Sequence, residues 1–517
     1  MSARKERLNV IAYPYRNTTP QEQQRISLDR LLNYITDVVY PYSPYYRKVF
    51  KVRAIDPTVI RSYEDFRRAV PLTFKEDIVA NLPEFTVAPS DPVRPSNFDV
   101  EALASHHFDG YRRAAQHSGT RDIFGLRSEE ERVREQYLFE WQPVHFQMSG
   151  GSTGRAITTG YTVHDLALMS RTGAWLYQLN GLISQEDVWL NLLPAAPHLG
   201  IYAALLVPYT NGQPNVNTFG GKVMPTERQI EIAVETGCSA ILALPSYLTH
   251  WLRTAKKLLD EGRIKPFGKI KVAICVGEPL TEPYRAMLKE LFSSIGCGDV
   301  SVLEGMSSTE LRSGGFYECS EGSKLHMDPE YFYPEILHPE TREPVEPGEP
   351  GVFVWSHIDW RGTAILRYWT GDYVSGGMVW DECAHCKLTM PRLRTPIWRA
   401  ERDFTKIRGA RVEYVALQDA VRSVPGVRTY QIIVRKQVAE DPSSRDLLDI
   451  YLAEGPEIDR ERLSDLVQEA VKMQVELRAD SIIFESADEI EARLFSKKLK
   501  AEWIVDQRNQ FTDAVKS

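Results

Sequence analysis

Residues 147–162, QMSGGSTGRAITTGYT, form the densest run of small and hydroxyl-bearing residues in the chain. The run contains, in succession, Ser149, Gly150, Gly151, Ser152, Thr153 and Gly154. Because glycine has no Cβ to block the approach, the backbone N–H groups of such a turn can converge on phosphate oxygens. The run lacks the lysine of G-x-x-x-x-G-K-[ST], so it is not a P-loop of that type. Taken alone, it favours a plain flexible surface turn.

Five later stretches carry charged groups that could act with this loop. They are VGEPLTEPYR (276–285), MSSTE (306–310), ILRYWTGDYV (365–374), RDFTKIRGARVE (402–413) and SKKLKAEW (496–503). Each also has an ordinary structural interpretation. Asp372 could be a solvated turn aspartate, Glu310 a glutamate favoured at a helix start by the dipole, and the lysines near 500 a solvated charge run.

The cysteines suggest a metal site. Cys383-x-x-Cys386 has the spacing of a metal knuckle, and Cys319 and His326 lie about sixty residues upstream. Two such pairs could close a tetrahedral Cys₃His zinc site, with His385 as a competitor for the fourth place. Four protein ligands leave no open position, so this zinc would be structural. The alternative is a set of plain buried thiols, as we expect for Cys238, Cys275 and Cys297.

The elements that must position these groups predict an α/β protein. Leu28, Leu31, Leu32, Ile35 and Val38 recur at near-helical spacing, and residues 20–70 are therefore expected to be helical. Between 185 and 310, short apolar runs alternate with amphipathic stretches, which indicates an α/β domain. Residues 330–380 are expected to be β-rich, and the polar residues 100–146 to form an inserted surface segment.

A boundary is predicted near residues 398–410. Two apolar strands, TYQIIVRK and LLDIYLAEG, precede a helix that carries Leu463, Val467 and Val471, and SIIFES follows as a further strand. This order predicts a small α+β domain over residues 401–517, behind a large domain over residues 1–400.

Composition narrows the function classes. The chain has 517 residues, a net charge of −8, six cysteines and 43% hydrophobic residues. An acidic chain of this kind does not suggest a nucleic-acid binder. No apolar run approaches the roughly 20 residues that span a bilayer, and the first residues carry no apolar signal region. We therefore expect a cytoplasmic, reduced protein without a membrane partner.

Taken in order, the motifs resemble the AMP-forming acyl/aryl ligase superfamily, and most closely its phenylacetate–CoA ligase branch. SPYYRKVF, VPLTFKEDI, the TGYT after the Gly-rich loop and FYPEILHPETREPVEPGEPG are also typical of that branch. The resemblance covers nearly the whole chain. It implies a large adenylate-forming domain with mixed α/β sheets and a β-rich subdomain, followed by a small mobile α+β domain.

The resemblance also implies a two-step reaction. A carboxylate attacks the α-phosphate of ATP to give an acyl adenylate and pyrophosphate, and the thiol of coenzyme A then displaces AMP. In this scheme Ser149–Gly154 hold the β- and γ-phosphates, Thr309 contacts the nucleotide, and Glu310 helps to hold Mg²⁺. Asp372 binds the ribose hydroxyls, and Gly277, Glu278 and Pro279 line the adenine slot.

The small domain would supply the remaining groups. Lys500 is the expected adenylation lysine, with Lys498 as the alternative register. Arg408 begins the domain's first turn beside the nucleotide, Gly409 lines the coenzyme A tunnel, and Arg402 or Asp403 forms the hinge. Rotation of this domain would switch the enzyme between its two half-reactions.

The acyl pocket is expected at 194–205 and 243–250, with Tyr161, His198, Gly200, Ala243 and Pro245 as its candidates. Small residues there favour an aromatic acid of the benzoate, anthranilate or phenylacetate type over a long fatty chain. His198 could equally be a satisfied core histidine.

Three functions remain open from the sequence. The first is an aryl-CoA ligase. The second is an adenylating enzyme that passes the acyl group to an amine or a carrier-protein thiol. The third is a non-catalytic nucleotide- or acyl-binding relative. A homodimer is a further option that the sequence does not decide.

Overall fold

The computed structural model describes most of the chain between residues 18 and 508. The undescribed parts are 1–17, 88–128, 150–156, 180, 195–198, 222, 313–314, 400–403, 408–409, 440–443, 456–458, 496–500 and 509–517.

The N-terminal segment is helical, as the periodicity predicts. Its elements are α2 (Pro20–Tyr34), the π-helical turn η1 (Ile35–Val39), α3 (Tyr40–Tyr42), α4 (Pro44–Val52), η2 (Pro57–Val59), α5 (Tyr63–Ala69), α6 (Lys75–Asn81) and η3 (Leu82–Phe85). Helix α2 begins where the Thr19 side chain accepts the N–H of Glu22, with Pro20 in the first turn. Leu31, Ile35 and Phe66 are buried in the core that these helices share with the β-rich sheet.

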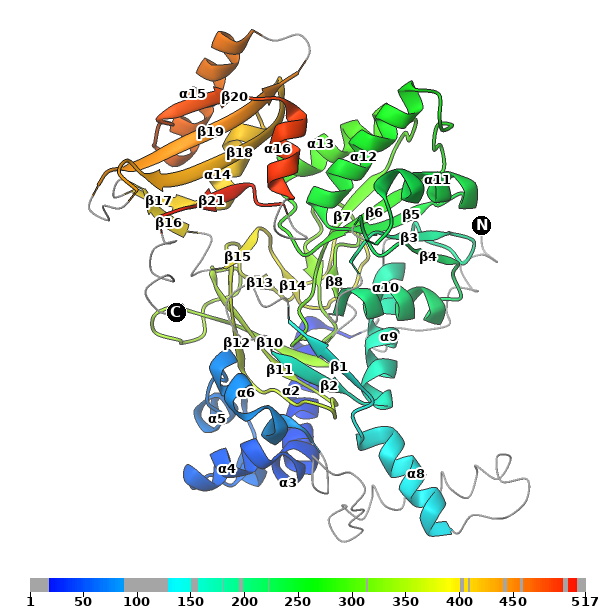
Figure 1. The fold of residues 1–517 in the computed structure, drawn as a ribbon. Helices are drawn as coiled ribbons and strands as arrows, with labels where there is room; N and C mark the ends of the chain where they lie inside the picture. Colours follow the sequence, from blue (N-terminus) through cyan, green and yellow to red (C-terminus); the bar gives the residue numbers. More distant parts are fainter. Residues whose placement is uncertain are drawn as a thin grey trace.

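A nine-stranded sheet forms the centre of the large domain (Figure 1), in the order β13-β14-β9-β8-β7-β6-β5-β3-β4. Its strands are β3 (Trp189–Asn191), β4 (Asn215–Asn217), β5 (Ala240–Ala243), β6 (Val272–Val276), β7 (Ser301–Met306), β8 (Phe316–Tyr317), β9 (Leu325–His326), β13 (Met378–Val379) and β14 (Arg392–Leu393). The strands from β4 to β7 are parallel. Strands β3, β5, β6 and β7 are the apolar runs expected from the sequence, since central parallel strands are buried on both faces, whereas the half-buried edge strand β4 was not expected.

Helices cover both faces of this sheet. They are α9 (Val163–Gln178), α10 (Leu199–Thr210), α11 (Thr226–Thr236), α12 (Pro245–Asp260) and α13 (Glu282–Ser294). Ile241 packs with residues of α11, α12 and α13, whereas its neighbour Leu242 packs with Ala204 and Val207 of α10. The alternation of one strand thus places α10 on one face and α11–α13 on the other.

The β-rich region between 330 and 400 is an antiparallel sheet in the order β10-β11-β12-β15. Its strands are β10 (Phe332–Leu337), β11 (Gly351–His357), β12 (Tyr368–Val374) and β15 (Ile397–Arg399). Gly351 lies so close to its neighbour that an added Cβ would come within 2.7 Å of the Leu337 carbonyl oxygen. A separate hairpin of β1 (His145–Met148) and β2 (Thr158–Tyr161) flanks the Gly-rich loop.

The segment expected as a polar insertion is only partly described. Residues 129–141 form helix α8 (Glu129–Trp141), which buries Val133, Tyr137 and Trp141 in the same core as the N-terminal helices. Residues 100–128 lie outside the described part of the chain.

The C-terminal elements include a four-stranded sheet in the order β20-β19-β18-β21 and a separate two-stranded hairpin, β16-β17. They are β16 (Phe404–Ile407), β17 (Ala410–Glu413), α14 (Tyr414–Arg422), β18 (Val427–Lys436), β19 (Asp446–Glu454), α15 (Arg460–Val475), β20 (Ser481–Phe484), α16 (Ala487–Leu494) and β21 (Ile504–Asp506). The expected order of two strands, helix and strand is present, and Leu463, Val467 and Val471 of α15 are buried. Helix α16 and strand β21 follow this predicted order of elements and were not expected. The expected α/β class with a second, α+β unit is confirmed.

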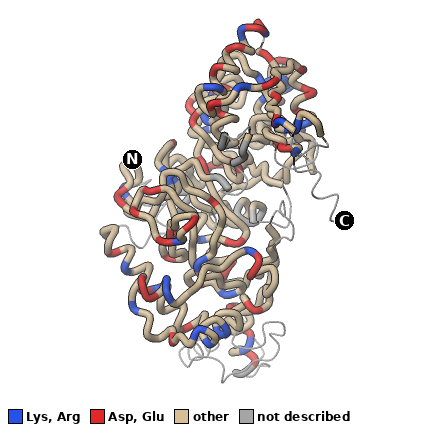
Figure 2. The backbone as a smooth tube through the Cα atoms, turned by 90° about the vertical axis from the view of Figure 1, so that its left-hand side faces the viewer, with Lys and Arg blue, Asp and Glu red and all other residues tan. Residues whose placement is uncertain are grey.

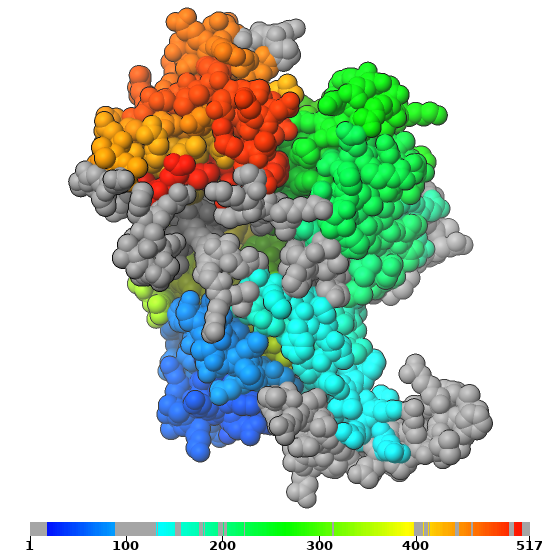
Figure 3. Space-filling model, in the orientation of Figure 1, coloured from blue at the N-terminus to red at the C-terminus, as the bar shows by residue number. Residues whose placement is uncertain are grey.

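The small unit rests on helices α12 and α13 of the large one (Figure 3). The Thr281 hydroxyl donates to Asp419 over 2.7 Å, and the guanidinium of Arg422 lies 3.9 Å from the ring centre of Tyr284.

Among the described residues, acidic and basic positions are interspersed along the backbone and do not gather into one basic stretch (Figure 2). Among the described helices, none has both the length and the apolar character needed to cross a bilayer.

Candidate functional site

The ends of the Gly-rich loop are pinned to each other. Ser149 donates its backbone N–H to the Ile157 carbonyl, and its hydroxyl accepts the N–H of Ile157, both over 2.8 Å. This pairing extends the β1–β2 hairpin and closes a loop of seven residues, 150–156, which lie outside the described residues. The structure therefore defines where the loop begins and ends. Phosphate binding by Gly150, Gly151, Ser152, Thr153 and Gly154 stays a prediction.

Thr309 and Glu310 lie in a turn that follows β7 and faces the start of this loop. The Thr309 hydroxyl donates to the carbonyl of Met148, the last residue of β1, over 3.4 Å. The Tyr161 hydroxyl donates to the Thr309 carbonyl over 3.1 Å. Thr309 and Glu310 are each only 7% exposed. Two motifs 161 residues apart in sequence are thus brought together, because the β1–β2 hairpin, a separate sheet, contacts the turn that follows β7.

The Gly277–Pro279 turn follows β6, directly beside β7. Gly277 has φ +80°, a backbone conformation that glycine adopts without strain. The Glu278 carboxylate accepts the N–H of Ser246 over 3.0 Å and its hydroxyl over 2.8 Å. These bonds cap the start of α12, so the Glu278 side chain has a structural task beside its expected place in the adenine slot.

Glu304 is a buried carboxyl group beneath this turn that the sequence motifs did not single out. Its Oε1 accepts the N–H of Leu280 over 3.2 Å, and the side chain is 5% exposed. Burial, with the nearby carboxylate of Glu318, raises the pKa of Glu304 to about 8. An acidic residue inside the apolar run VSVLEGM was the available sequence signal, because a charge is seldom placed on a buried strand without a reason.

Asp372 lies within β12 rather than in a solvated turn. It is 8% exposed, and its N–H donates to the Thr370 hydroxyl over 2.9 Å. In the antiparallel pairing with β15 it stands opposite Arg399. Its burial within a strand excludes the solvated-turn interpretation, and its binding role stays a prediction.

The described acyl-pocket candidates come from three places. Ala243 ends β5 and Pro245 begins α12; both are buried, and both adjoin the edge where β6 and β7 end. Gly200 lies in the first turn of α10. Tyr161 is fully buried, with the Arg312 guanidinium 4.3 Å from its ring centre. His198 lies outside the described residues.

Cys319, His326, Cys383 and Cys386 meet at the far edge of the nine-stranded sheet. Their four ligand atoms lie within 4.8 Å of one another. The Sγ atoms of Cys319 and Cys383 are 3.7 Å apart, and Cys386 Sγ is 3.3 Å from His326 Nε2. A tetrahedral site with Zn–S bonds of about 2.3 Å has ligand separations of about 3.8 Å, so the four residues fit zinc. His326 Nδ1 faces the carbonyls of Tyr317 and Lys324, which leaves Nε2 free to bind a metal.

Five predicted residues of the small domain cannot be placed. The roles of these residues stay predictions because all five lie outside the described residues: Arg402, Asp403, Arg408, Gly409 and Lys500. The domain boundary at 400/401 also stays a prediction.

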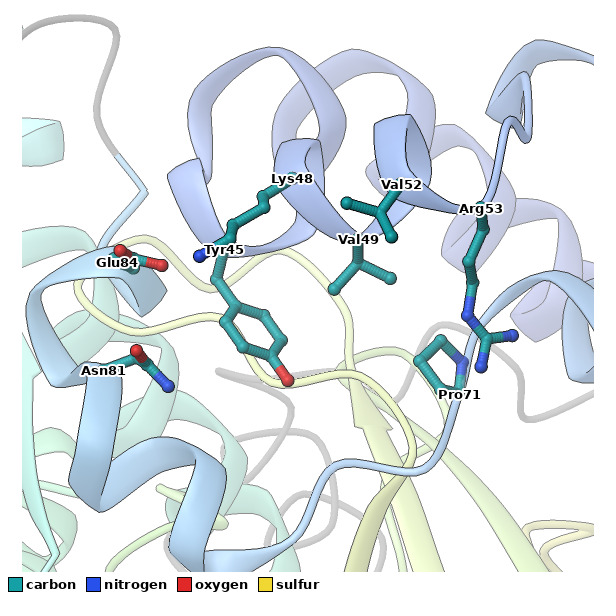
Figure 4. A pocket seen from close by; sticks show the side chains of 8 residues that line it. All are labelled: Tyr45, Lys48, Val49, Val52, Arg53, Pro71, Asn81 and Glu84. Carbon is teal, nitrogen blue, oxygen red and sulfur yellow. The ribbon is translucent and has the colours of Figure 1, made fainter.

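A separate hollow of about 270 Å³ lies among the N-terminal helices (Figure 4). Its lining residues are Tyr45, Lys48, Val49, Val52, Arg53, Pro71, Asn81 and Glu84. Tyr45, Lys48 and Val49 belong to the segment SPYYRKVF and Pro71 to VPLTFKEDI. None of the eight is a predicted site residue, and we assign this hollow no function.

Comparison with known proteins agrees with this geometry. A phenylacetate-coenzyme A ligase of Thermus thermophilus is 26% identical over 477 residues, covering 88% of each chain. A phenylacetate-coenzyme A ligase of Aromatoleum evansii is 23% identical over 438 residues, covering 83% of this chain and 78% of the relative.

Solved structures share the fold. A crystal structure of 2-hydroxyisobutyryl-CoA ligase in the postadenylation state superposes with a TM-score of 0.73 at 17% identity, covering 97% of this chain and 94% of that one. Residues 90–357, just over half of the chain, match the family of AMP-binding enzymes. The resemblance of the motifs is thereby confirmed: the chain belongs to the AMP-binding enzyme family.

Proposed function

We propose that this chain is an ATP-dependent, AMP-forming ligase that activates an aromatic carboxylic acid and transfers it to coenzyme A. The observation that carries the proposal is the hydrogen bond from Thr309 to the Met148 carbonyl, which joins the Glu310 turn to the start of the Gly-rich loop. A Gly-rich sequence that starts beside a turn carrying a buried glutamate would suit a polyphosphate and its metal ion. The phenylacetate-coenzyme A ligases among the relatives support the same reaction class.

Each residue has a role in this scheme. Ser149–Gly154 would hold the β- and γ-phosphates, while Asp372 would accept hydrogen bonds from the ribose hydroxyls and Gly277–Pro279 would flank adenine. Glu310 would bind Mg²⁺, which neutralises phosphate charge when bound. The substrate carboxylate attacks the α-phosphorus, the bond to the β-phosphate oxygen breaks and pyrophosphate leaves. The thiol of coenzyme A then attacks the acyl carbon and AMP leaves.

The small domain would complete the site. Lys500 would stabilise the negative charge that develops on the α-phosphate, with Arg408 beside the nucleotide. Gly409 would line the pantetheine tunnel, and Arg402 or Asp403 would act as the hinge between the two half-reactions.

An aromatic acid is the proposed substrate class. The candidates at the edge of the sheet include the small residues Ala243 and Gly200 and, at the start of α12, Pro245. His198 and Tyr161 remain the candidate aromatic contacts. A flat aromatic ring needs a wide, shallow pocket, and small lining residues are compatible with such a pocket.

We also propose that Cys319, His326, Cys383 and Cys386 hold a structural zinc ion. Their separations fit tetrahedral coordination, and three of the four are buried. Such an ion would tie the turn after β8 and strand β9 to the loop between β13 and β14. The four ligands would fill its coordination, so the ion would take no part in the reaction.

The decisive experiment is ATP–pyrophosphate exchange with a panel of benzoate-, anthranilate- and phenylacetate-type acids. Exchange that depends on one of these acids supports adenylation, and exchange with none of them would leave the nucleotide-binding, non-catalytic interpretation. Acyl-CoA in the mass spectrum after addition of coenzyme A would distinguish a CoA ligase from an enzyme that uses an amine or a carrier-protein thiol.

Two further expectations accompany the proposal. All six cysteines are unpaired, which supports a reducing compartment such as the cytoplasm. The homodimer stays a prediction.

A further inference from the structure

Arg312 is the most unusual buried residue near the proposed site. It follows Glu310 by two residues, is 0% exposed and has φ +64°, in the left-handed region that favours glycine. Backbone strain and a buried guanidinium both cost free energy, so the surrounding structure must hold the residue in place. Strained residues of this kind cluster at functional sites.

The Arg312 guanidinium is held from several sides. Its Nη1 donates to the Thr363 carbonyl over 2.7 Å and lies 3.5 Å from the carboxylate of Asp165, which is also 0% exposed. The guanidinium stands over the rings of Tyr161, at 4.3 Å, and Trp360, at 5.4 Å. Its Nε and Nη2 atoms find no acceptor among the described residues. Two unused donors indicate that stability alone did not select this side chain.

Asp165 anchors this arginine to the scaffold. One carboxylate oxygen accepts the N–H of Thr162 over 3.0 Å and that of Gly362 over 2.7 Å, and the other accepts the N–H of Arg361 over 2.8 Å. With three backbone donors, the carboxylate joins the start of α9 to the loop between β11 and β12. Arg312 is thus attached to two segments that cannot shift independently.

Tyr161 connects this anchor to the proposed phosphate site. Its ring lies against Arg312, and its hydroxyl donates to the Thr309 carbonyl over 3.1 Å. Thr309 in turn donates to the Met148 carbonyl, where the Gly-rich loop begins. A continuous set of contacts therefore runs from Asp165 through Arg312 and Tyr161 to the turn that carries Glu310.

We propose that Arg312 is a positioning residue, which acts through the Tyr161 ring to hold the Thr309–Glu310 turn against the start of the Gly-rich loop. This inference rests on the proposed function, and it assigns Arg312 a role that no motif of the sequence indicated. A planar guanidinium can stack on the ring and bond to the Thr363 carbonyl at once, whereas a lysine ammonium cannot reproduce that geometry.

The test compares Arg312→Lys with a matched control. Arg367 is also buried, also has a positive φ of +47°, and is also paired with a buried carboxylate, that of Glu335, but it contacts the N-terminal residues Arg67 and Val70. Arg367→Lys should therefore reproduce the loss of a buried guanidinium without disturbing the Thr309–Glu310 turn. Tyr161→Phe keeps the ring and removes only the hydroxyl, so it tests the same connection even if Arg312→Lys folds poorly.

Arg312→Lys should lower the kcat for acid-dependent pyrophosphate exchange about tenfold per folded molecule, with the KM for the acid unchanged. Tyr161→Phe should lower it about fivefold with little change in Tm. The kcat of the double variant should lie within about twofold of the kcat of the less active single variant, because both changes break one connection. Arg367→Lys should stay within about twofold of the wild type per folded molecule.

Two results would overturn the inference. One is a normal kcat in Arg312→Lys. The other is a double variant whose loss equals the product of the two single losses. If the wild type shows no exchange with any acid, the proposed ligase function fails instead, and MgATP affinity becomes the readout. A Kd for MgATP about tenfold weaker in Arg312→Lys than in Arg367→Lys would then support the inference, and equal values would reject it.

Discussion

Arg253 Nη1 lies 2.7 Å from Glu491 Oε1, which joins helix α12 of the large domain to helix α16 of the small one. His250, one turn earlier on α12, places its Nδ1 3.6 Å from the same carboxylate. The side chains of Arg253 and Glu491 are each less than one-fifth exposed, so solvent screens the pair only in part. Burial works against ionisation of Glu491, but the hydrogen bond from His250 and the charge of Arg253 outweigh it and hold its pKa below the usual range.

Glu491→Gln should weaken this docking of the small domain. Removing one partner of a half-buried pair should cost about 1–2 kcal/mol, which shifts the docked population roughly tenfold. Small-angle scattering should then show a larger radius of gyration, and acidification of the wild type should act in the same direction. Glu227→Gln, which breaks an exposed pair with Arg263 inside the large domain, is the control. Identical profiles for the two variants would argue against the contact.

The buried Glu304 should make stability depend on pH. Since burial raises its pKa to about 8, the folded protein keeps a proton on Glu304 that the unfolded chain releases near the ordinary glutamate range. Stability should therefore fall as pH rises from about 5 to 8, by at most about 1.4 kcal/mol per pH unit. Urea unfolding at several pH values should show this slope in the wild type.

Glu304→Gln provides the comparison. A neutral amide can still accept the Leu280 N–H, but it has no proton to lose, so the slope due to this group should disappear. If the variant and the wild type lose stability in parallel between pH 6 and pH 8, roughly the range over which Glu304 would ionise, another group is responsible.

The large sheet could be predicted from the sequence because its strands are buried on both faces. The runs CSAILALP and KVAICVGEP contain β5 and β6, and a run that is apolar at every position has few other ways to avoid water. The turns after β6 and β7, which carry Gly277–Pro279 and Glu310, lie at one edge because these parallel strands are neighbours in the sheet. The roles of these residues came from the resemblance of the motifs and stay predictions.

Contacts between residues far apart in the sequence account for the structural features that the sequence did not predict. Glu278 caps a helix through Ser246, 32 residues earlier in the chain, and Arg312 is held by Asp165 from another segment. Neither partner is visible in the local pattern. In α8 the pattern existed but was obscured by charge: Val133, Tyr137 and Trp141 recur every four residues within a strongly charged helix, and all three are buried.

The zinc site should be measurable directly. We expect about one zinc ion per chain in purified protein and a loss of zinc in Cys386→Ser, because three ligands bind less tightly than four. Cys238→Ala changes a buried cysteine outside the cluster and should retain the metal. Removal of zinc by a chelator should lower Tm without changing the acid specificity. Elemental analysis that finds less than about 0.2 zinc per chain would rule the site out.

The adenylation lysine can be identified by separating the two half-reactions. Lys500→Ala should lower pyrophosphate exchange by about two to three orders of magnitude, because a charge-stabilising donor is lost where negative charge develops. The same variant should still form the thioester when acyl adenylate is supplied, since that step does not require the lysine at the α-phosphate. Lys498→Ala is the matched control, two residues away in the same charged run. If Lys498→Ala shows the selective loss and Lys500→Ala does not, the register shifts by two residues and Lys498 becomes the adenylation lysine.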